Sequence, residues 1–592
     1  MLLKRNERRT IGVVNMDFRN AVAMKVMETT GLDLETVNRL IEIPPQEDMG
    51  DYAFPCFALA KTMRKAPNMI ASELSSSDKL SADWLSKVEA KGPYLNFFVD
   101  RGAFAKEVLS EVLEKGTSFG QSEEGSGKTV IIEYSSPNIA KPFHVGHAFT
   151  TILGHSLSRI YEKLGYKVVR MNHLGDYGTQ FGKLITAFRL WGDEEALEKD
   201  AIAELLRIYV KFHEEEKKDE NLTTLARENF KKLEDGCEEE VALWKRFRDL
   251  SLKEFNKLYD RMGVSFDNYN GESFYSNLIP GIVDMLREKG LLVESEGAQV
   301  VMLDEKKLPP CIILKSDGTT IYASRDLAAA KYRYDTYHFD KNIYVVGMPQ
   351  ALHFQQVFAV LEKAGMPFAK NCEHVGFGLV KFQNMKFSTR EGNIVTLEDL
   401  LNESVAKTYE LIKANAEARN SDLSEDELKA IAEKVGLGAV IYTYVKAGRE
   451  RDIVFSWDTM LDFEGDTAPY LIYTYARTRS ILRKAAEQGF VPEKAGSALL
   501  NKLSGDEEFA CVKMIADLPE AVKKAASSNE PFMVSRAVAQ IARSFNRFYN
   551  NCSILGGDDN ELKTARLALC QAVCDAIEAG TYLLGIPVVE QM

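Results

Sequence analysis

The stretch EYSSPNIAKPFHVGHAF, residues Glu133–Phe149, decides the fold of this chain. It begins at the end of an apolar run, TVIIEYS, and leads into the amphipathic segment HAFTTILGHSLSRIYEKLG, which ends at Gly165. A second apolar run, YKVVRMNHLGD, follows directly. A buried strand, a helix closed by glycine and another strand predict a βαβ unit, hence a parallel sheet with a right-handed crossover. Open parallel sheets bind ligands at the carboxyl ends of their strands, so we expect a site within this stretch.

Two histidines, His144 and His147, lie three residues apart where the helix is predicted to begin. Helix N-termini offer unpaired N–H groups to anions, and Gly146 would let a nucleotide pack against the backbone. The same pair could instead cap the helix or form half of a metal site. The strand, glycine and helix context favours a nucleotide site. The nearby GSGKT at Gly125–Thr129 is no phosphate loop, because Ser122 replaces its first glycine and a strand follows it.

The remaining pattern divides the chain into regions. Residues 16–115 predict a small α+β unit with a helix at 17–29 and a strand in GPYLNFFVD, and FGQSEEGSGKT is its linker. Charge-rich helices are predicted for about 190–295. Strand patterns return in AQVVML, CIILKSDGTTIYAS and KNIYVVG, which indicates a parallel sheet split by a helical insertion. From about residue 399 onward the pattern is helical.

Composition excludes several classes of function. The 592 residues suggest three to five domains, and the net charge of -13 argues against a polybasic nucleic-acid binder. We expect no membrane span, because no apolar run approaches the required length, and no signal peptide. The eight cysteines form no C-x-x-C pair, so we expect neither zinc nor disulfides and a reduced, cytoplasmic protein.

The residues His144 to His147, HVGH, resemble the HIGH signature of class I aminoacyl-tRNA synthetases. SSPNIAKPFHVGH, followed by NHLGDYGTQFGKL, resembles arginyl-tRNA synthetases more specifically. The sequence MKFSTREG at 385–392 is similar to the second class signature, KMSKS, but has Thr389 where the second lysine belongs. The resemblance extends from GDYAFPCFALAK in the N-terminal unit to the terminal LLGIPVVEQM.

Amino-acid activation requires in-line positioning and donors where negative charge develops on the phosphates of ATP. The resemblance implies that the two histidines donate to the α and β phosphates, and that Lys386 reaches the leaving pyrophosphate. Lys141 and Arg390 are the candidates to replace the missing lysine. The implied catalytic residues are His144, His147, Lys141, Lys386, Ser388 and Arg390. The implied ATP-binding residues are His144, Gly146, His147, His353, Lys386 and Phe387. His353 is equally compatible with helix capping. Mg²⁺ would accompany ATP, and no protein-held metal is expected.

An arginine substrate brings five N–H donors, so its pocket must supply acceptors. The resemblance implies that Glu133, Tyr322 and Asp326 receive the guanidinium group. The α-amino and carboxylate end would be held by Asn138 and Gln350, and Ser136 completes the implied set. Tyr322 and Asp326 are four residues apart, and Ser324 is a plausible helix N-cap. Without the resemblance, Asp326 would be read as a helix-start carboxylate and Tyr322 as a core aromatic.

The tRNA partner is expected on the C-terminal helices. Residues 466–592 carry 14 Lys and Arg against 15 Asp and Glu, with arginines interleaved among aromatics. Such side chains suit unpaired bases. Tyr549, Asn550 and Met592 are the candidate contacts. Phe545 and Phe548 are better explained as a core stripe.

The resemblance implies a multidomain α/β plus α protein. We expect an N-terminal domain at 1–120 that contacts the tRNA elbow and a Rossmann-like catalytic domain at 128–398 with the insertion. A helical stem-contact connection at 399–461 and an all-α anticodon-binding domain at 462–592 would follow. The implied function is that of a monomeric, cytoplasmic arginine–tRNA ligase that uses ATP, L-arginine and tRNA(Arg). The alternatives are a cofactor nucleotidylyltransferase, which leaves the helical third unexplained, and a catalytically silent tRNA-binding paralogue.

Overall fold

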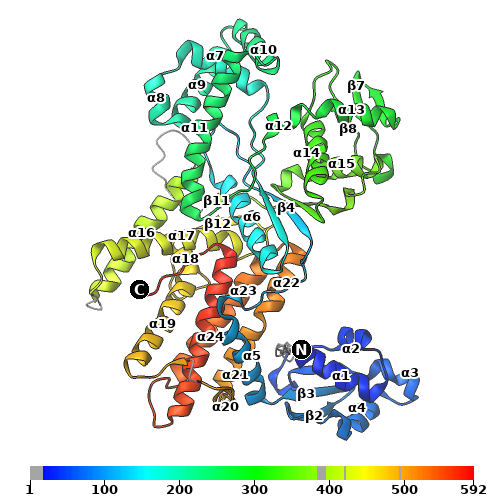
Figure 1. Cartoon of the computed structure of the whole chain (residues 1–592), viewed down its shortest axis with the longest axis vertical. Coiled ribbons are helices and arrows are strands. Elements are labelled where there is room, and N and C mark those ends of the chain that lie inside the picture. The colour runs from blue at the N-terminus through cyan, green and yellow to red at the C-terminus, as the bar shows by residue number, and fades with distance from the viewer. Residues whose placement is uncertain (1–17, 383–394, 419–421, 493–494) are drawn as a thin grey trace, which may run out of the picture. The chain divides into compact units, whose positions relative to one another are not determined.

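The computed structural model describes residues 18–382, 395–418, 422–492 and 495–592 (Figure 1). The chain forms two compact units, each treated by itself below. The first comprises residues 1–119, 477–517 and 540–577, and the second 120–476, 518–539 and 578–592. The helices α19 (Ala468–Glu487), α23 (Phe532–Asn551) and α24 (Asn560–Leu584) each contribute to both units. The domain limits expected from the sequence stay a prediction.

The second unit is built on a four-stranded sheet of order β10-β9-β4-β5, in which every neighbouring pair is parallel. The strands are β4 (Thr129–Glu133), β5 (Lys167–Met171), β9 (Lys341–Val345) and β10 (Cys372–Val375). Helix α6 (Val145–Lys163) connects β4 to β5. The βαβ unit predicted around Glu133–Phe149 is therefore confirmed. Because β4 pairs on both sides, Ile131 and Ile132 are fully buried.

Two of the three strand patterns expected in the parallel sheet lie elsewhere. Strands β6 (Leu292–Ser295), β7 (Ala298–Val301) and β8 (Cys311–Leu314) form a separate antiparallel sheet of order β6-β7-β8. The turn between β6 and β7 has Glu296 and Gly297 at φ values of 51° and 79°. Two consecutive left-handed residues make a tight hairpin, and a hairpin pairs strands antiparallel. Of the three predicted strand patterns, only KNIYVVG enters the parallel sheet, where it forms β9. The fourth strand of that sheet is β10.

The predicted helical insertion is confirmed, although it begins earlier than expected, with α7. Its helices are α7 (Thr179–Trp191), α8 (Glu194–Lys199), α9 (Ala201–Glu215), α10 (Asn221–Glu234), α11 (Glu238–Met262), α12 (Glu272–Ser276) and α13 (Ile279–Glu288). Phe181, Phe212 and Phe247 are fully buried in a common core. The charged run at 214–220 lies at the end of α9 and in the turn that follows.

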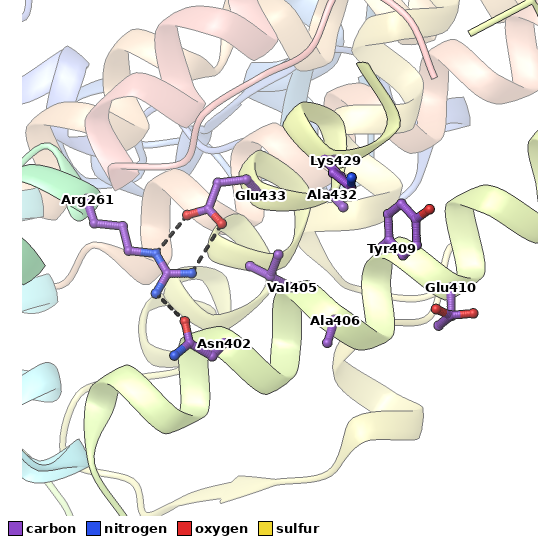
Figure 2. A pocket seen from close by; sticks show the side chains of 9 residues that line it. All are labelled: Arg261, Asn402, Val405, Ala406, Tyr409, Glu410, Lys429, Ala432 and Glu433. Carbon is purple, nitrogen blue, oxygen red and sulfur yellow. Dashed lines mark hydrogen bonds and ion pairs between the residues drawn. The ribbon is translucent and has the colours of Figure 1, made fainter. Parts of the chain in front are cut away.

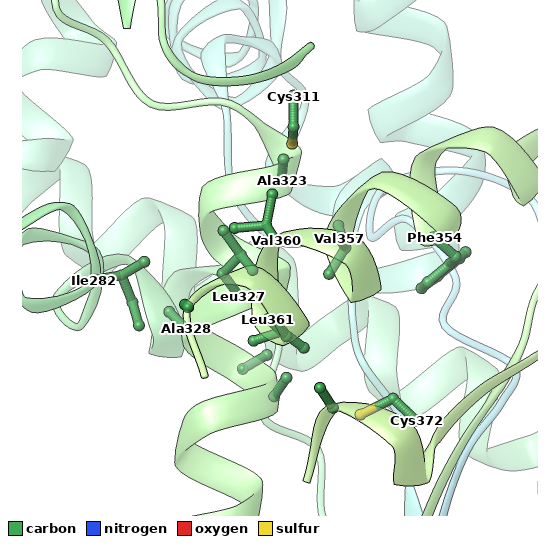
Figure 3. Packing of buried hydrophobic residues seen from close by; sticks show 14 of the residues in the cluster. Ile282, Cys311, Ala323, Leu327, Ala328, Phe354, Val357, Val360, Leu361 and Cys372 are labelled. Atoms are coloured by element: carbon green, nitrogen blue, oxygen red, sulfur yellow. The ribbon is translucent and has the colours of Figure 1, made fainter. Parts of the chain in front are cut away.

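A second core fixes two helices that carry predicted site residues. They are α14 (Tyr322–Tyr337), with Asp326, and α15 (Ala351–Lys363), with His353. Figure 3 shows Leu327 and Ala328 of α14 facing Val357, Val360 and Leu361 of α15. All five are 2% exposed or less. Fully burying one large aliphatic side chain stabilises a fold by about 1.5–3 kcal/mol. The cluster therefore holds the first turns of both helices firmly in place.

Helices dominate the rest of the second unit. They are α16 (Leu397–Ala418), α17 (Glu425–Val445), α18 (Trp457–Met460) and α22 (Leu518–Ser528), beside the short parallel pair β11 (Val380–Phe382) and β12 (Ile453–Phe455). Helix α17 starts with a capping box in which Ser424 and Glu427 satisfy each other's backbone N–H groups.

The first unit contains the small α+β fold expected at the N-terminus. An antiparallel sheet of order β1-β3-β2 combines β1 (Tyr52–Pro55), β2 (Leu85–Lys91) and β3 (Tyr94–Val99). Its helices are α1 (Phe18–Thr30), α2 (Leu34–Leu40), α3 (Ala60–Met63), α4 (Pro67–Ser75) and α5 (Arg101–Lys115). Phe54, Leu95 and Phe97 fill its core. The later helices α20 (Ser497–Leu500) and α21 (Asp506–Ala516) belong to the same unit.

Among the described helices, α24 is long and apolar enough to cross a membrane by length and composition alone, which the sequence did not lead us to expect. However, 78% of its most apolar window is buried within the protein. Cys570, Val573 and Ile577 on this helix are fully buried. These properties are those of a core helix.

Candidate active site

The two motif histidines form the first turn of α6. His144 is the N-cap, and its Nδ1 accepts a hydrogen bond from the Gly146 N–H at 3.1 Å. The His147 Nδ1 in turn accepts from the His144 N–H at 3.3 Å. The rings stack with centroids 3.8 Å apart. A Cβ at residue 146 would lie 2.9 Å from the His144 ring, so glycine is needed there for the imidazole as well as for any ligand.

These contacts determine the chemistry of the pair. Because both Nδ1 atoms accept from backbone N–H groups, a neutral imidazole at either position carries its proton on Nε2. Burial, reinforced by His144 and Lys141, lowers the pKa of His147 to about 3. Burial likewise lowers the pKa of His144. The capping interpretation is thus confirmed. Nε2 of each ring is left as a donor, and its use toward phosphates stays a prediction.

The turn between β4 and α6 is unusual. Ser135 and Ser136 have φ values of 69° and 47°, in the left-handed region that non-glycine residues seldom adopt. Hydrogen bonds hold this conformation. The Ser135 hydroxyl lies 2.7 Å from the Tyr259 hydroxyl, and the Ser136 N–H donates to Asn172 Oδ1 at 3.2 Å. Strained backbone fixed by buried partners is typical of functional sites.

Asn138 is positioned by the chain after β5. The Ile139 N–H donates to the Gly175 carbonyl oxygen at 3.2 Å, and residues 138 and 175 form an isolated parallel bridge. A Cβ on residue 175 would lie 2.1 Å from Asn138 Oδ1. The glycine in NHLGD is therefore required for the asparagine side chain to occupy its place. Asp176 beside it is buried and accepts from the Ser273 N–H and hydroxyl, which is a structural role.

The side chain of Glu133, at the end of β4, forms an ion pair with a residue that sequence reasoning did not find. Its side chain is 7% exposed and pairs at 2.5 Å with Nη2 of Arg333, which is completely buried. Arg333 lies on α14, 200 residues further along the chain. Only the spatial meeting of β4 and α14 brings the two together, and no local pattern signals such a contact.

Asp326 and Tyr322 lie on the first turns of α14. The Asp326 carboxylate receives a 2.5 Å hydrogen bond from His353 Nε2 on α15. Tyr322 is 63% exposed, so the core-aromatic interpretation is wrong. The predicted N-cap at Ser324 is also wrong, because the helix already begins at Tyr322 with Ile321 as its cap. The Ser324 hydroxyl instead donates to the Ile313 carbonyl oxygen.

A third carboxylate, Glu272 of α12, was missed by sequence reasoning. It pairs with Arg325 at 3.5 Å. Burial raises its pKa to about 7, against the effect of Arg325 and reinforced by the negative charge of Asp326. Arg325 also lies over the ring of Tyr322 at 5.2 Å. The candidate pocket therefore contains more acidic groups than the sequence pattern indicated.

The remaining predicted residues differ in their surroundings. Gln350, at the end of a 3₁₀ turn before α15, is exposed. Lys141 is half-buried, and among the described residues no ion pair with it is found. His155 is buried on α6.

The predicted residues Lys386, Phe387, Ser388 and Arg390 lie outside the described residues. The segments on either side are well defined. Before them, β11 pairs with β12. After them, Leu397 N–H donates to the Phe143 carbonyl oxygen at 2.9 Å, and residue 396 bridges His144. The chain that follows the KMSKS-like sequence thus pairs with the histidine motif itself.

The candidate tRNA contacts belong to both units. Tyr549 and Asn550 are exposed on α23, in the first unit, and Tyr549 carries Arg477 at 4.8 Å from its ring. Met592 belongs to the second unit. Phe545 and Phe548 are fully buried, which confirms the core stripe.

Two surface cavities occur in the second unit, away from the predicted residues. The first, of about 350 Å³, is lined by α11, α16 and α17 (Figure 2). Its Arg261 is held by Glu433 at 2.7 Å and by Asn402 at 2.7 Å. The second, of about 380 Å³, lies between Arg159, Gly263 and the chain end at Gly585 to Val588. Because its arginine is already paired, the first cavity is poorly suited to bind phosphate.

A parallel sheet whose first crossover helix begins with stacked histidines, combined with a helical C-terminal region, defines a class I aminoacyl-tRNA synthetase fold. The family described as "tRNA synthetases class I (R), catalytic domain" matches residues 108–457. "Arginyl tRNA synthetase N terminal domain" matches 16–99 and "DALR anticodon binding domain" matches 471–592. The chain belongs to the arginyl-tRNA synthetase family.

Individual relatives agree with this assignment. The arginine–tRNA ligase of Clostridium botulinum (strain Loch Maree / Type A3) is 55% identical over 577 residues, which cover 98% of this chain and 100% of the relative. That of Clostridium perfringens (strain 13 / Type A) has the same identity and coverage. The Thermus thermophilus arginyl-tRNA synthetase structure matches with a TM-score of 0.78 and 25% identity, covering 98% of this chain and all of that one. The Plasmodium falciparum enzyme matches with a TM-score of 0.79 and 24% identity over 98% and 99% of the two chains, which supports the fold.

Proposed function

We propose that this protein joins L-arginine to tRNA(Arg) in two steps. The carboxylate of arginine attacks the α-phosphorus of ATP, forming arginyl-adenylate and releasing pyrophosphate. The terminal ribose hydroxyl of tRNA then attacks the carbonyl carbon, forming arginyl-tRNA and releasing AMP. The full-length identity with arginine–tRNA ligases supports this reaction.

The residue roles follow from the site. His144 and His147 would donate from Nε2 to the α and β phosphates, where charge accumulates in the transition state. Neutral donors suit this task, because their hydrogen bonds need no titration near pH 7. Lys141 is the described cation nearest to them in sequence, while the roles of Lys386, Phe387, Ser388 and Arg390 remain part of the proposal.

The substrate arginine would be bound by two sets of groups. Glu133, Tyr322 and Asp326 would accept from the guanidinium, and Ser136, Asn138 and Gln350 would hold the α-amino and carboxylate end. The observation that carries this assignment is that two carboxylates from separate elements, Glu133 of β4 and Asp326 of α14, lie near one buried side chain, since burial raises the pKa of Tyr344 and the charges of both carboxylates raise it further. Carboxylates match the planar donor fork of arginine better than the single ammonium of lysine.

Mg²⁺ would arrive with ATP. Among the described residues there is no group of three or more His, Cys, Asp or Glu side chains that could hold a metal ion. Such ions are commonly bound through substrate phosphates with few protein ligands, so we assign the protein no metal-dependent step of its own. Contacts of Tyr549, Asn550 and Met592 with tRNA, the domain roles, the cytoplasmic location and the monomeric state form the rest of the proposal.

Activation is expected to depend on tRNA, as the resemblance to this family implies. Purified enzyme should exchange labelled pyrophosphate into ATP with arginine and tRNA(Arg) present, and exchange should be at background without tRNA. A periodate-oxidised tRNA, which cannot accept the amino acid, serves as the control and should still support exchange. Robust exchange with a different amino acid would contradict the proposed substrate.

A further inference from the structure

Helix α14 presents two charged residues on one face. Asp326 and Arg333 are seven residues, two helical turns, apart. Asp326 meets His353, whereas Arg333 meets Glu133 at 2.5 Å. Arg333 has a side-chain exposure of 0%, so its charge lies entirely within the protein.

This pairing gives Glu133 a counter-charge inside the protein. The Glu133 side chain is 7% exposed, and a buried charge without a partner is costly. Arginine remains protonated in proteins, so Arg333 is a permanent counter-charge. Its hydrogen bond uses only Oε2 of Glu133. Among the described residues, no hydrogen bond to Oε1 is found, and that oxygen can still accept from a ligand.

The geometry differs from that of a purely structural ion pair. In the pair of the half-buried Arg566 and the buried Glu508, two guanidinium nitrogens donate to the carboxylate, at 2.9 and 2.8 Å. Arg333 uses one nitrogen toward Glu133, and its Nε and Nη1 are buried without a partner in the described part of the chain.

The guanidinium of Arg333 is nevertheless held in place. It lies 5.8 Å from the ring of Tyr275 and 5.3 Å from that of Tyr344. The His173 Nδ1 is 3.4 Å from the same Nη2. Leaving buried donors unsatisfied is destabilising, and such arrangements are characteristic of functional sites.

We propose that Arg333 is a positioning residue for arginine recognition, which balances the charge of Glu133 and holds its carboxylate so that Oε1 receives the substrate guanidinium. This inference rests on the proposed arginine-binding role of Glu133. The two carboxylates then have different roles. Glu133, whose charge is balanced by Arg333, supplies a directed acceptor. Asp326 supplies the net negative charge.

The test compares Arg333→Gln with the wild-type enzyme in tRNA-dependent pyrophosphate exchange. We expect the KM for arginine to rise at least about tenfold, as is typical when one partner of a buried charge pair is removed. The KM for ATP should stay within about twofold, since the proposed ATP site is at His144 and His147 and not at this pair.

Several variants make the result specific. Arg189→Gln removes the cation beside Glu240, another buried carboxylate, and should leave the arginine KM unchanged. Arg333→Lys restores the charge and should bring the arginine KM back to within a few fold of the wild-type value. Burial raises the pKa of Tyr275, of Tyr344 and, to about 12, of Cys372, so these neighbours stay neutral. His173→Gln measures how much the histidine beside Arg333 contributes to the arginine KM. Asp326 is kept in every variant, so its contribution to the arginine KM is constant.

The outcomes separate the inference from the proposed function. If Glu133→Gln leaves the arginine KM unchanged, the proposed role of Glu133 is wrong. If Glu133→Gln raises it and Arg333→Gln does not, only the positioning role is wrong. Should Arg333→Gln fail to fold, Arg333→Lys decides: a rise of a few fold in the arginine KM with an unchanged KM for ATP supports the inference, and equal rises for arginine and ATP contradict it.

Discussion

Asp326→Asn should raise the KM for arginine by about a hundredfold, because it replaces a charge-assisted contact to the guanidinium with a neutral one. The carboxylate lies on the first turns of α14, and its one observed partner is His353, at 2.5 Å. The Asp326 side chain is 20% exposed, so this carboxylate is accessible to a competing cation. With Glu133 already paired to Arg333, Asp326 supplies most of the net attraction for the substrate side chain.

The measurement is the steady-state KM for arginine and for ATP in the exchange reaction. The KM for ATP should change by less than about threefold, because the lost interaction belongs to arginine. Asp335→Asn on the same helix removes an exposed carboxylate paired with Lys331 and is the matched control. Equal losses for arginine and ATP would mean that Asp326 serves only to fix His353.

Alanine at His147 should lower the rate of adenylate formation by a hundredfold or more, on the order of 3 kcal/mol of transition-state stabilisation. The loss should appear in kcat, because the donor acts where charge develops during the reaction. The assignment of the His147 proton to Nε2 leads to a more specific prediction about two other substitutions. His147→Gln can place an amide N–H near the position of Nε2 and should keep more activity than His147→Asn, whose amide reaches only the position of Nδ1.

Single-turnover formation of adenylate, with tRNA present, measures this effect directly. His213→Ala removes an exposed histidine paired with Glu216 in the helical insertion and should behave like the wild type. Thermal unfolding of each variant accounts for the lost helix cap, worth about 0.5–2 kcal/mol. If Asn proves better than Gln at residue 147, the assignment of the proton to Nε2 is wrong.

Local patterns predicted the part of the site that is contiguous in sequence. The strand ending at Glu133, the helix start at His144 and the requirement for Gly146 all follow from periodicity and from the behaviour of helix termini. The stacked histidines and their Nδ1 contacts depend on the same few residues. That is why the histidine motif was expected at the helix start, where the structure has it.

Contacts between distant segments could not be predicted in this way. Arg333 and Glu272 complete the candidate pocket, yet each belongs to a helix whose own pattern explains it as packing or surface. Strands β7 and β8 have ordinary apolar patterns, which do not specify a partner strand, so they were assigned to the wrong sheet. The left-handed Ser135 and Ser136 carry no signal either, because the buried partners Tyr259 and Asn172 come from remote segments.

The net charge of the chain is likewise of limited use for predicting its function. The net value of -13 correctly disfavoured a polybasic protein but is silent about a nucleic-acid substrate recognised by local groups. We propose that the exposed Tyr549, with Arg477 over its ring, is one such group, because an aromatic ring can stack on a base.

The most direct test of the central claim is aminoacylation of tRNA(Arg) by the purified full-length chain, with each of the twenty amino acids supplied separately with ATP and Mg²⁺. The account predicts that arginine is attached to the tRNA, that lysine and the other amino acids remain at background, and that Asp326→Asn removes most of the charging at low arginine concentration. Charging with any other amino acid, or none with arginine, would contradict it.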